Sequence, residues 1–290
     1  MKYITLAGGR RLSYMEFGKG DGMPVFYFHG APSSCLEPLL VGEEAFCRHG
    51  LRIIAPNRPG IGHSDFQVSR KFMDWPSDVI SLADHLKLEN FSLLGNSGGG
   101  PYVTACATRI PERLLSAVVV SGGWQMNLPQ TRRYLQFPFN LFWIVTEKFP
   151  FLLPILLNAM RSPATEPREK RPKRPQRMMP LPDYQAIMDS NRLEVLEQAV
   201  NESLRSMRGV TWDLRLFVAA FGFSFSDITF PITFFHGEQD KNLPVELVRV
   251  HVGQIPNAKL ITFKGEAHLS VLCNQFGRIA ERIKTPNRME

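Results

Sequence analysis

Four short and almost wholly apolar runs constrain the fold of this chain most strongly. Each ends in glycine or polar residues, and they are PVFYFHG (24–30), LRIIAPN (51–57), FSLLGN (91–96) and LSAVVVSGG (115–123). Continuous apolarity predicts strands that are buried on both faces, as in a parallel sheet. Stretches of helical character and crossover length separate the runs, at roughly 36–48, 75–87 and 99–109. The pattern predicts repeated β-α units.

The remaining chain extends this pattern and interrupts it once. Residues 3–6 and 11–17 are typical of an N-terminal hairpin, and strand patterns return at 231–237 and 259–265, followed by helices near 244–254 and 269–284. Between the two series lie about 100 residues that are rich in Phe, Leu, Met and Pro and have no clear strand pattern. We therefore predict a core formed by 1–123 and 226–290, with a helical insertion at 124–225.

Charge is concentrated in one short segment. The net charge is +7, but residues 166–177, EPREKRPKRPQR, supply +4 of it. A nucleic-acid-binding protein is disfavoured because the charge is not spread over a face or groove. The three prolines forbid a regular helix, so we expect a solvated loop there. A peripheral membrane contact through 166–177 is the less favoured alternative.

The cysteines and the apolar segments bear on the cellular compartment. Cys35, Cys47, Cys106 and Cys273 show no metal-ligand or redox spacing, so reduced and buried thiols are expected. The N-terminus lacks the pattern of a signal peptide. The most apolar stretch, 135–160, contains three prolines and two charged residues, which disfavours a transmembrane helix. These features predict a cytoplasmic protein.

A Gly-x-Ser-x-Gly motif stands where a predicted strand meets a helix. The strand at 91–94 runs into Gly95-Asn96-Ser97-Gly98-Gly99, and the helix follows directly. A serine in so sharp a turn projects above the carboxyl end of the sheet. The flanking glycines, Gly95 and Gly99, fit positions where a Cβ atom would be too close to the backbone. The helix N-terminus then allows the Gly98 amide to face a developing oxyanion.

A serine nucleophile requires a histidine base and a carboxylate that orients it. His268 is the only histidine in a short loop after the last strand, and Gly265 gives that loop freedom to turn. Asp240 follows strand 231–235 at the same edge of the sheet, with Glu238 as a local rival. The other candidate place for the acid, the loop after strand 115–120, has no carboxylate. The sequence therefore predicts Ser97, His268 and Asp240 as a catalytic triad.

These residues, in this chain order, resemble the α/β-hydrolase superfamily. The resemblance covers the whole core and implies an α/β-hydrolase fold: a mostly parallel eight-stranded sheet flanked by helices, with a helical cap after strand 6. HGAPSS (29–34) resembles the family's His-Gly-x-Pro loop, which implies Ala31 as a second oxyanion donor beside Gly98. RPGIGHSD (58–65) is similar to a segment of the esterase, haloperoxidase and prolyl-aminopeptidase branches. Asn57 replaces the aspartate usual there, and we expect it to affect loop packing rather than chemistry.

The serine at the elbow implies acyl transfer, since dehalogenases and epoxide hydrolases of this fold carry aspartate at that position. The leading hypothesis is a serine hydrolase that uses no cofactor or metal. The apolar insertion predicts an uncharged, largely apolar ester substrate, although most of its apolar residues are expected to pack against the core. A lactonase, a carbon-carbon bond hydrolase and a prolyl aminopeptidase would use the same triad. A non-catalytic ligand receptor on the same fold is the alternative from another class.

Overall fold

The computed structural model describes residues 1–161, 179–188 and 192–286. Its centre is one eight-stranded sheet with the order β1-β2-β4-β3-β5-β6-β7-β8. β2 is antiparallel to β1 and β4, and the other neighbours are parallel. The strands are β1 (Lys2–Thr5), β2 (Arg11–Gly18), β3 (Met23–Phe28), β4 (Leu51–Pro56), β5 (Phe91–Asn96), β6 (Leu114–Val120), β7 (Ile232–Gly237) and β8 (Ala258–Phe263). The predicted mostly parallel eight-stranded fold is confirmed.

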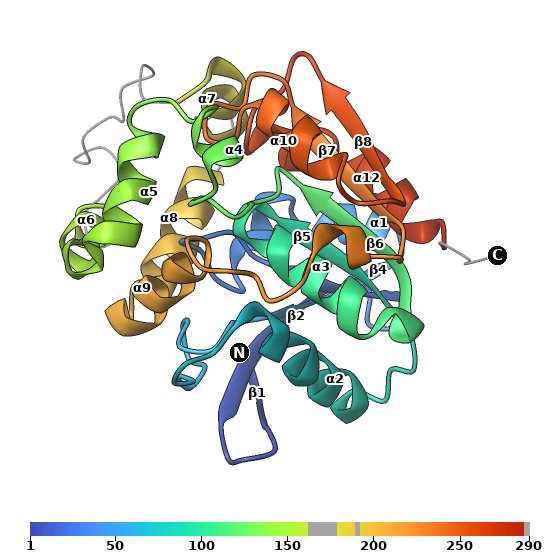
Figure 1. The fold of residues 1–290 in the computed structure, drawn as a ribbon. Helices are drawn as coiled ribbons and strands as arrows, with labels where there is room; N and C mark the ends of the chain where they lie inside the picture. Colours follow the sequence, from blue (N-terminus) through green and yellow to red (C-terminus); the bar gives the residue numbers. More distant parts are fainter. Residues whose placement is uncertain (162–178, 189–191, 287–290) are drawn as a thin grey trace.

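Helices cover both faces of this sheet (Figure 1). They are α1 (Glu43–Arg48), α2 (Trp75–His85), α3 (Gly100–Arg109), α10 (Val245–Val252), α11 (Ser270–Asn274) and α12 (Phe276–Lys284). In β3, Phe26 and Phe28 belong to the buried cluster that contains residues of α2, α3 and α10. Val25 and Tyr27 belong to the cluster that contains residues of α1 and α12. Because alternate side chains of a strand are buried on opposite faces, the strand reads as a continuous apolar run.

The chain between β6 and β7 contains helices and no strand in the part that the structure describes. These helices are α4 (Pro129–Arg132), α5 (Phe139–Lys148), α6 (Leu153–Asn158), α7 (Leu181–Met188), α8 (Arg192–Ser203) and α9 (Met207–Leu216). The short 3₁₀ helix η5 (Pro150–Leu152) joins α5 to α6. The basic segment 166–177, for which we predicted a solvated loop, lies outside the described residues.

Two predicted helices are each divided in the structure. The stretch 36–48 consists of the 3₁₀ helix η1 (Glu37–Leu40) and α1, which are separated by Gly42 with φ +93°. The stretch 269–284 consists of α11 and α12. Both predictions had the correct type of element but missed the break, because the apolar pattern continues across it.

The cysteines and the most apolar stretch differ in part from expectation. All four thiols are free, but Cys47 on α1 is exposed, so the prediction that all are buried was wrong. No single helix within the described ranges is long and apolar enough to cross a membrane. Phe139–Lys148 and Pro150–Asn158 would meet the length and composition criteria only as a pair, and they are bent by 111°.

Candidate active site

Ser97 lies in a strained turn at the carboxyl end of β5. β5 ends at Asn96, a single 3₁₀ turn follows, and α3 begins at Gly100. Ser97 has φ 48°, which is unfavourable for a residue with a side chain. A Cβ atom on Gly95 would lie 2.8 Å from the Gly99 oxygen, and one on Gly99 would lie 2.0 Å from the Phe28 oxygen. The two glycines therefore allow the close approach of backbone that the turn requires.

The three residues predicted to act together form one hydrogen-bonded chain. His268, in the loop after β8, has its Nε2 2.8 Å from the Ser97 Oγ and its Nδ1 2.7 Å from the Asp240 Oδ2. The other Asp240 oxygen accepts hydrogen bonds from the backbone amides of Asn242 and Leu243, at 2.8 and 3.0 Å. These bonds fix the orientation of the Asp240 carboxylate. The three residues follow β5, β7 and β8, so segments that lie far apart in the sequence meet at this site.

The charges around Ser97, His268 and Asp240 favour one protonation pattern for these three residues. Burial lowers the pKa of His268, but the negative charges of Asp240 and Asp183 outweigh burial and leave the pKa raised. Burial raises the pKa of Asp240, but the interaction with His268 outweighs it and leaves that pKa lowered. Asp240 is therefore ionised and holds the Nδ1 proton of the imidazole. In the neutral ring, Nε2 then accepts the hydroxyl proton of Ser97.

The rival carboxylate, Glu238, lies in another environment. The Glu238 Oε1 accepts a hydrogen bond from the Thr262 hydroxyl at 2.7 Å and lies 3.9 Å from Arg249. The neighbouring His236 donates to the Leu243 carbonyl at 2.8 Å and lies 3.6 Å from the Asp240 Oδ2, and burial lowers its pKa. Asp240, and not Glu238, is therefore the carboxylate that contacts His268 Nδ1.

The Ala31 and Gly98 backbones are close neighbours. A Cβ atom on Gly98 would lie 2.9 Å from the Ala31 nitrogen and 2.8 Å from the Ala31 Cβ. Glu37, which is buried, accepts hydrogen bonds from the Gly30 amide at 3.0 Å and from the Asn96 side chain at 2.9 Å. One carboxylate therefore ties together the residues that precede Ala31 and Ser97. Glu37 was not predicted, because in the sequence it is a single acid within an apolar stretch.

A buried ion cluster supports the same loop from the other side. Arg58 donates to the carbonyl oxygens of His29 at 2.5 Å and Gly30 at 2.8 Å. Its guanidinium also pairs with Asp213 of α9 at 2.7 Å, and Arg70 pairs with the same carboxylate. All three charged side chains are at most 2% exposed. The cluster thus links α9 to the loop that contains Ala31.

Asp183 of α7 contacts the loop that contains His268. Its two oxygens accept hydrogen bonds from the backbone amides of His268 at 3.2 Å, Leu269 at 2.8 Å and Ser270 at 2.9 Å. From the opposite side, the Ser121 hydroxyl donates to the His268 carbonyl at 2.9 Å. Asp183 was not predicted, because its only sequence signal is an acid in the first turn of a helix.

Asn57 packs a loop, as its position in the sequence suggested. Its side-chain oxygen accepts from the Cys35 amide at 2.8 Å, and its amide donates to the Ser13 hydroxyl at 3.0 Å. These bonds join the segments around residues 13, 35 and 57. These bonds do not connect Asn57 to Ser97, Asp240 or His268.

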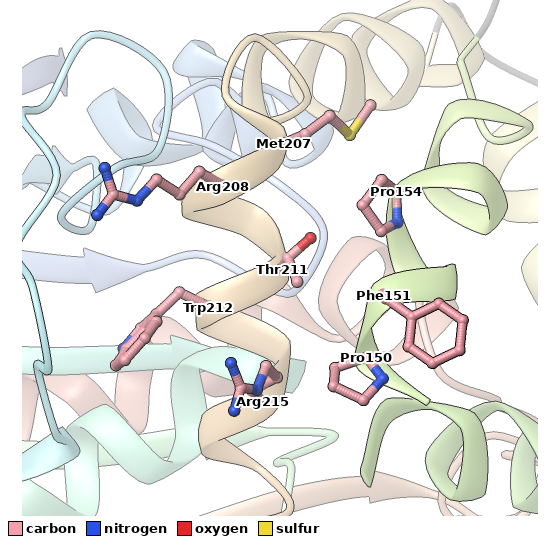
Figure 2. Close-up of a pocket in the computed structure, with 8 residues that line it drawn as sticks. All are labelled: Pro150, Phe151, Pro154, Met207, Arg208, Thr211, Trp212 and Arg215. Carbon is pink, nitrogen blue, oxygen red and sulfur yellow. The ribbon is translucent and has the colours of Figure 1, made fainter. Parts of the chain in front are cut away.

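Apolar side chains of the α4–α9 segment reach the neighbourhood of Ala31. Ala31, Phe142 and Trp143 pack against a buried cluster of Ile61, Leu153, Leu157, Leu204, Val210 and Leu214. A separate hollow of about 330 Å³ lies between η5 and α6 on one side and α9 on the other (Figure 2). Ser97, Asp240 and His268 do not line it. Among the described residues, no group of three or more His, Cys, Asp or Glu side chains could hold a metal ion.

Comparisons with known proteins agree with this architecture. A family model described as alpha/beta hydrolase fold matches residues 24–274. The chain is 34% identical over 111 residues to an uncharacterized hydrolase of Bacillus subtilis and 35% identical over 126 residues to a non-heme chloroperoxidase of Streptomyces lividans. These matches cover 38% and 42% of this chain, and only 37% and 44% of the relatives.

Similarity to solved structures extends over nearly the whole chain. An esterase from Thermogutta terrifontis superimposes with a TM-score of 0.65 at 20% identity, covering 98% of this chain and 96% of the esterase. At that identity, the similarity establishes the fold and not the substrate.

Proposed function

We propose that this chain, which belongs to the α/β-hydrolase fold family, is a serine hydrolase that cleaves carboxylic esters of apolar small molecules through an acyl-enzyme. The observation that carries this proposal is the hydrogen-bonded chain from Ser97 Oγ through the His268 imidazole to Asp240. A positioned base of this kind is what converts a serine hydroxyl into a nucleophile at neutral pH.

The geometry supports a two-stage reaction. The Ser97 oxygen attacks the ester carbonyl carbon while His268 Nε2 takes the hydroxyl proton, and Asp240 stabilises the imidazolium. The amides of Ala31 and Gly98 donate to the tetrahedral oxyanion. On collapse, the carbon-oxygen bond to the alcohol breaks and Nε2 returns its proton to the leaving oxygen. Water then attacks the acyl-enzyme by the same route and releases the acid and Ser97.

The α4–α9 segment supports an apolar substrate. We infer that residues 124–225 form a cap, because α6 and α9 supply four of the six residues of the cluster against which Ala31 packs, and Phe142 and Trp143 of α5 pack against the same cluster. Acyl or alkyl groups bound beside Ala31 would meet Phe142 and Trp143. The same triad would also open lactones, cleave carbon-carbon bonds or release an N-terminal proline. For the last activity a cap carboxylate must face the substrate ammonium. Of the candidates Glu147, Glu194, Glu197 and Glu202, Glu147 is paired with Arg132 and Lys148, and Glu202 lies 3.5 Å from His63 and 4.0 Å from Arg205.

The test is hydrolysis of p-nitrophenyl esters of increasing acyl length. We expect kcat/KM to rise by up to about fourfold per methylene until the pocket is filled, which corresponds to about 0.8 kcal/mol for each buried CH₂. The mono-p-nitrophenyl ester of suberate, whose terminal carboxylate is too distant to attack its own ester readily, is the matched control for the octanoate ester and should be a poor substrate. A flat profile, or a preference for the charged ester, would contradict an apolar acyl site.

The pH dependence tests the role of Asp183. General base catalysis requires neutral His268, and its pKa is raised above the ordinary value of 6.5. In the wild type, kcat/KM should therefore rise with pH along a limb centred above 6.5. Asp183→Asn removes a negative charge that stabilises the imidazolium, so this limb should move to lower pH. The exposed Asp227→Asn is the control, and a limb that stays in place in Asp183→Asn would contradict the assigned coupling.

A further inference from the structure

The outer side of α5, η5 and α6 exposes a concentration of large apolar side chains. Of the twelve large hydrophobic residues that are exposed in the described part of the chain, eight lie between residues 137 and 160. We call these eight the α5–α6 surface: Phe137, Leu141, Ile144, Phe149, Phe151, Ile155, Leu156 and Met160. Packing against the core, which was expected for most apolar residues of the insertion, does not account for them. Clustered exposed apolar residues mark a binding surface, whereas single ones are ordinary.

The position of this surface agrees with contact to something outside the molecule. α5 and α6 lie at the periphery, on the side away from the sheet (Figure 1). Phe151 is 71% exposed and Ile155 is 69% exposed. Phe151 also lines the 330 Å³ hollow, which opens between η5, α6 and α9 (Figure 2). The surface therefore combines projecting apolar side chains with an adjacent hollow.

The charges around this surface are positive. Residues 132–161 contain four basic side chains and one acid, Glu147, which gives a net charge of +3. Glu147 is paired with Arg132 and lies 3.6 Å from the Lys148 ammonium. Across the hollow, α9 contributes Arg215, which is exposed. Arg208 is also exposed, but its guanidinium lies 4.1 Å from the centre of the Phe66 ring and extends away from η5 and α6 (Figure 2). An apolar area bordered by cations complements an anionic lipid headgroup layer over an acyl phase.

We propose that the α5–α6 surface docks this protein onto an anionic membrane surface, with Phe151 and Ile155 inserted at the level of the acyl chains and the bordering basic residues at the phosphates. The helices lie on the membrane and do not cross it. α5 has ten residues and is about 15 Å long, half of the hydrocarbon thickness. The 111° bend prevents α5 from continuing through η5 and α6 as one straight span. A second copy of the chain on this surface would bring two groups of net charge +3 together.

Co-sedimentation with vesicles tests this proposal with the full chain. Two vesicle types are used: phosphatidylcholine alone, and a mixture of phosphatidylcholine with anionic phosphatidylglycerol. We expect binding to the anionic vesicles that weakens as salt rises from about 0.1 M to 0.5 M, because salt screens the basic residues. The variant Phe151→Ser/Ile155→Ser should lose at least about tenfold in partitioning, since it removes two large apolar side chains from the surface.

Val68→Ser is the matched control, because Val68 is 68% exposed and lies outside the α5–α6 surface. Circular dichroism and thermal unfolding confirm that all variants are folded, without reference to any enzymatic activity. Wild type that stays in the supernatant with anionic vesicles overturns the proposal, as does equal binding by the double variant and Val68→Ser. A wild-type dimer that becomes monomeric in the double variant, without vesicle binding, assigns the surface to a second copy instead.

Discussion

We expect Ser97→Ala to reduce kcat for a p-nitrophenyl ester by about 10³- to 10⁶-fold, because it removes the oxygen that attacks the carbonyl. The remaining groups, His268 with Asp240 and the amides of Ala31 and Gly98, would still favour attack by water on the bound ester. That residual contribution is about 10³- to 10⁴-fold over the uncatalysed reaction in enzymes of this type, so the loss need not be complete. Initial rates at saturating ester, with equal concentrations of folded protein, measure it.

The control for this substitution is Ser226→Ala, which removes an exposed hydroxyl whose hydrogen-bond partners, within the described part of the chain, are Ser224 and Asp227 beside it. It should retain the wild-type rate. Equal rates for Ser97→Ala and wild type would show that another group does the chemistry. Absence of turnover in wild type on esters, lactones and peptides would favour the non-catalytic receptor on the same fold.

We expect Asp213→Asn to destabilise the protein by about 3–5 kcal/mol, because it leaves two buried guanidinium groups without a counter-ion. Asp213 is 1% exposed and pairs with Arg58 and Arg70, and it accepts a hydrogen bond from the Tyr102 hydroxyl at 2.6 Å. The asparagine side chain is neutral, and its NH₂ group, which is a hydrogen-bond donor, would face one of these donor groups. Since domains are stable by about 5–15 kcal/mol, the change is a large fraction of the total. Urea unfolding of both proteins measures it.

The pH dependence of this difference is a second readout. Burial raises the pKa of Asp213, but the charges of Arg58 and Arg70 outweigh it and hold the pKa well below its usual range. A carboxylate whose pKa is lower in the folded state than in the unfolded state, where it is about 4, increases the free energy of unfolding at pH values above 4. This contribution is lost as the pH falls below about 4 and approaches the folded-state pKa. The difference in free energy of unfolding between wild type and Asp213→Asn should therefore become smaller as the pH falls below about 4.

The control is Asp84→Asn, which breaks an ion pair between Arg113 and a carboxylate that is 61% exposed. Its cost should be within about 1 kcal/mol. A similar small cost for Asp213→Asn, or a gap that stays constant as pH falls, would contradict the interpretation of the cluster as a buried charge-paired anchor.

The sequence predicted those parts of the fold that depend on local pattern. Both faces of the sheet are buried, so the central strands could be recognised as continuous apolar runs. Because Ser97, Asp240 and His268 each follow a predicted strand, they could be placed at the same edge of the sheet. The glycines at 95 and 99 were recognisable because the sharp turn requires them sterically. Element breaks such as the one at Gly42 were missed, since an apolar pattern continues across a short interruption.

Residues whose role depends on tertiary contact could not be identified in the same way. Asp183 and Asp213 are ordinary helical acids in the sequence, and only the packing of α7 and α9 brings them to the His268 loop and to Arg58. The apolar residues of α5 and α6 could not be divided into buried and exposed sets. Their packing partners come from α9 and from the loop around Ile61, which are distant in sequence.

Covalent labelling of Ser97 tests the proposed chemistry most directly. An alkyl fluorophosphonate requires an activated serine to attack phosphorus and expel fluoride, so the mass gained reports the nucleophile without assuming a substrate. Intact mass and peptide mapping should show one phosphonyl group per chain, on Ser97, with none in Ser97→Ala and much slower labelling in His268→Ala. Labelling of another residue, or a wild-type protein that remains unmodified while folded, would contradict the assignment of Ser97 as an activated nucleophile.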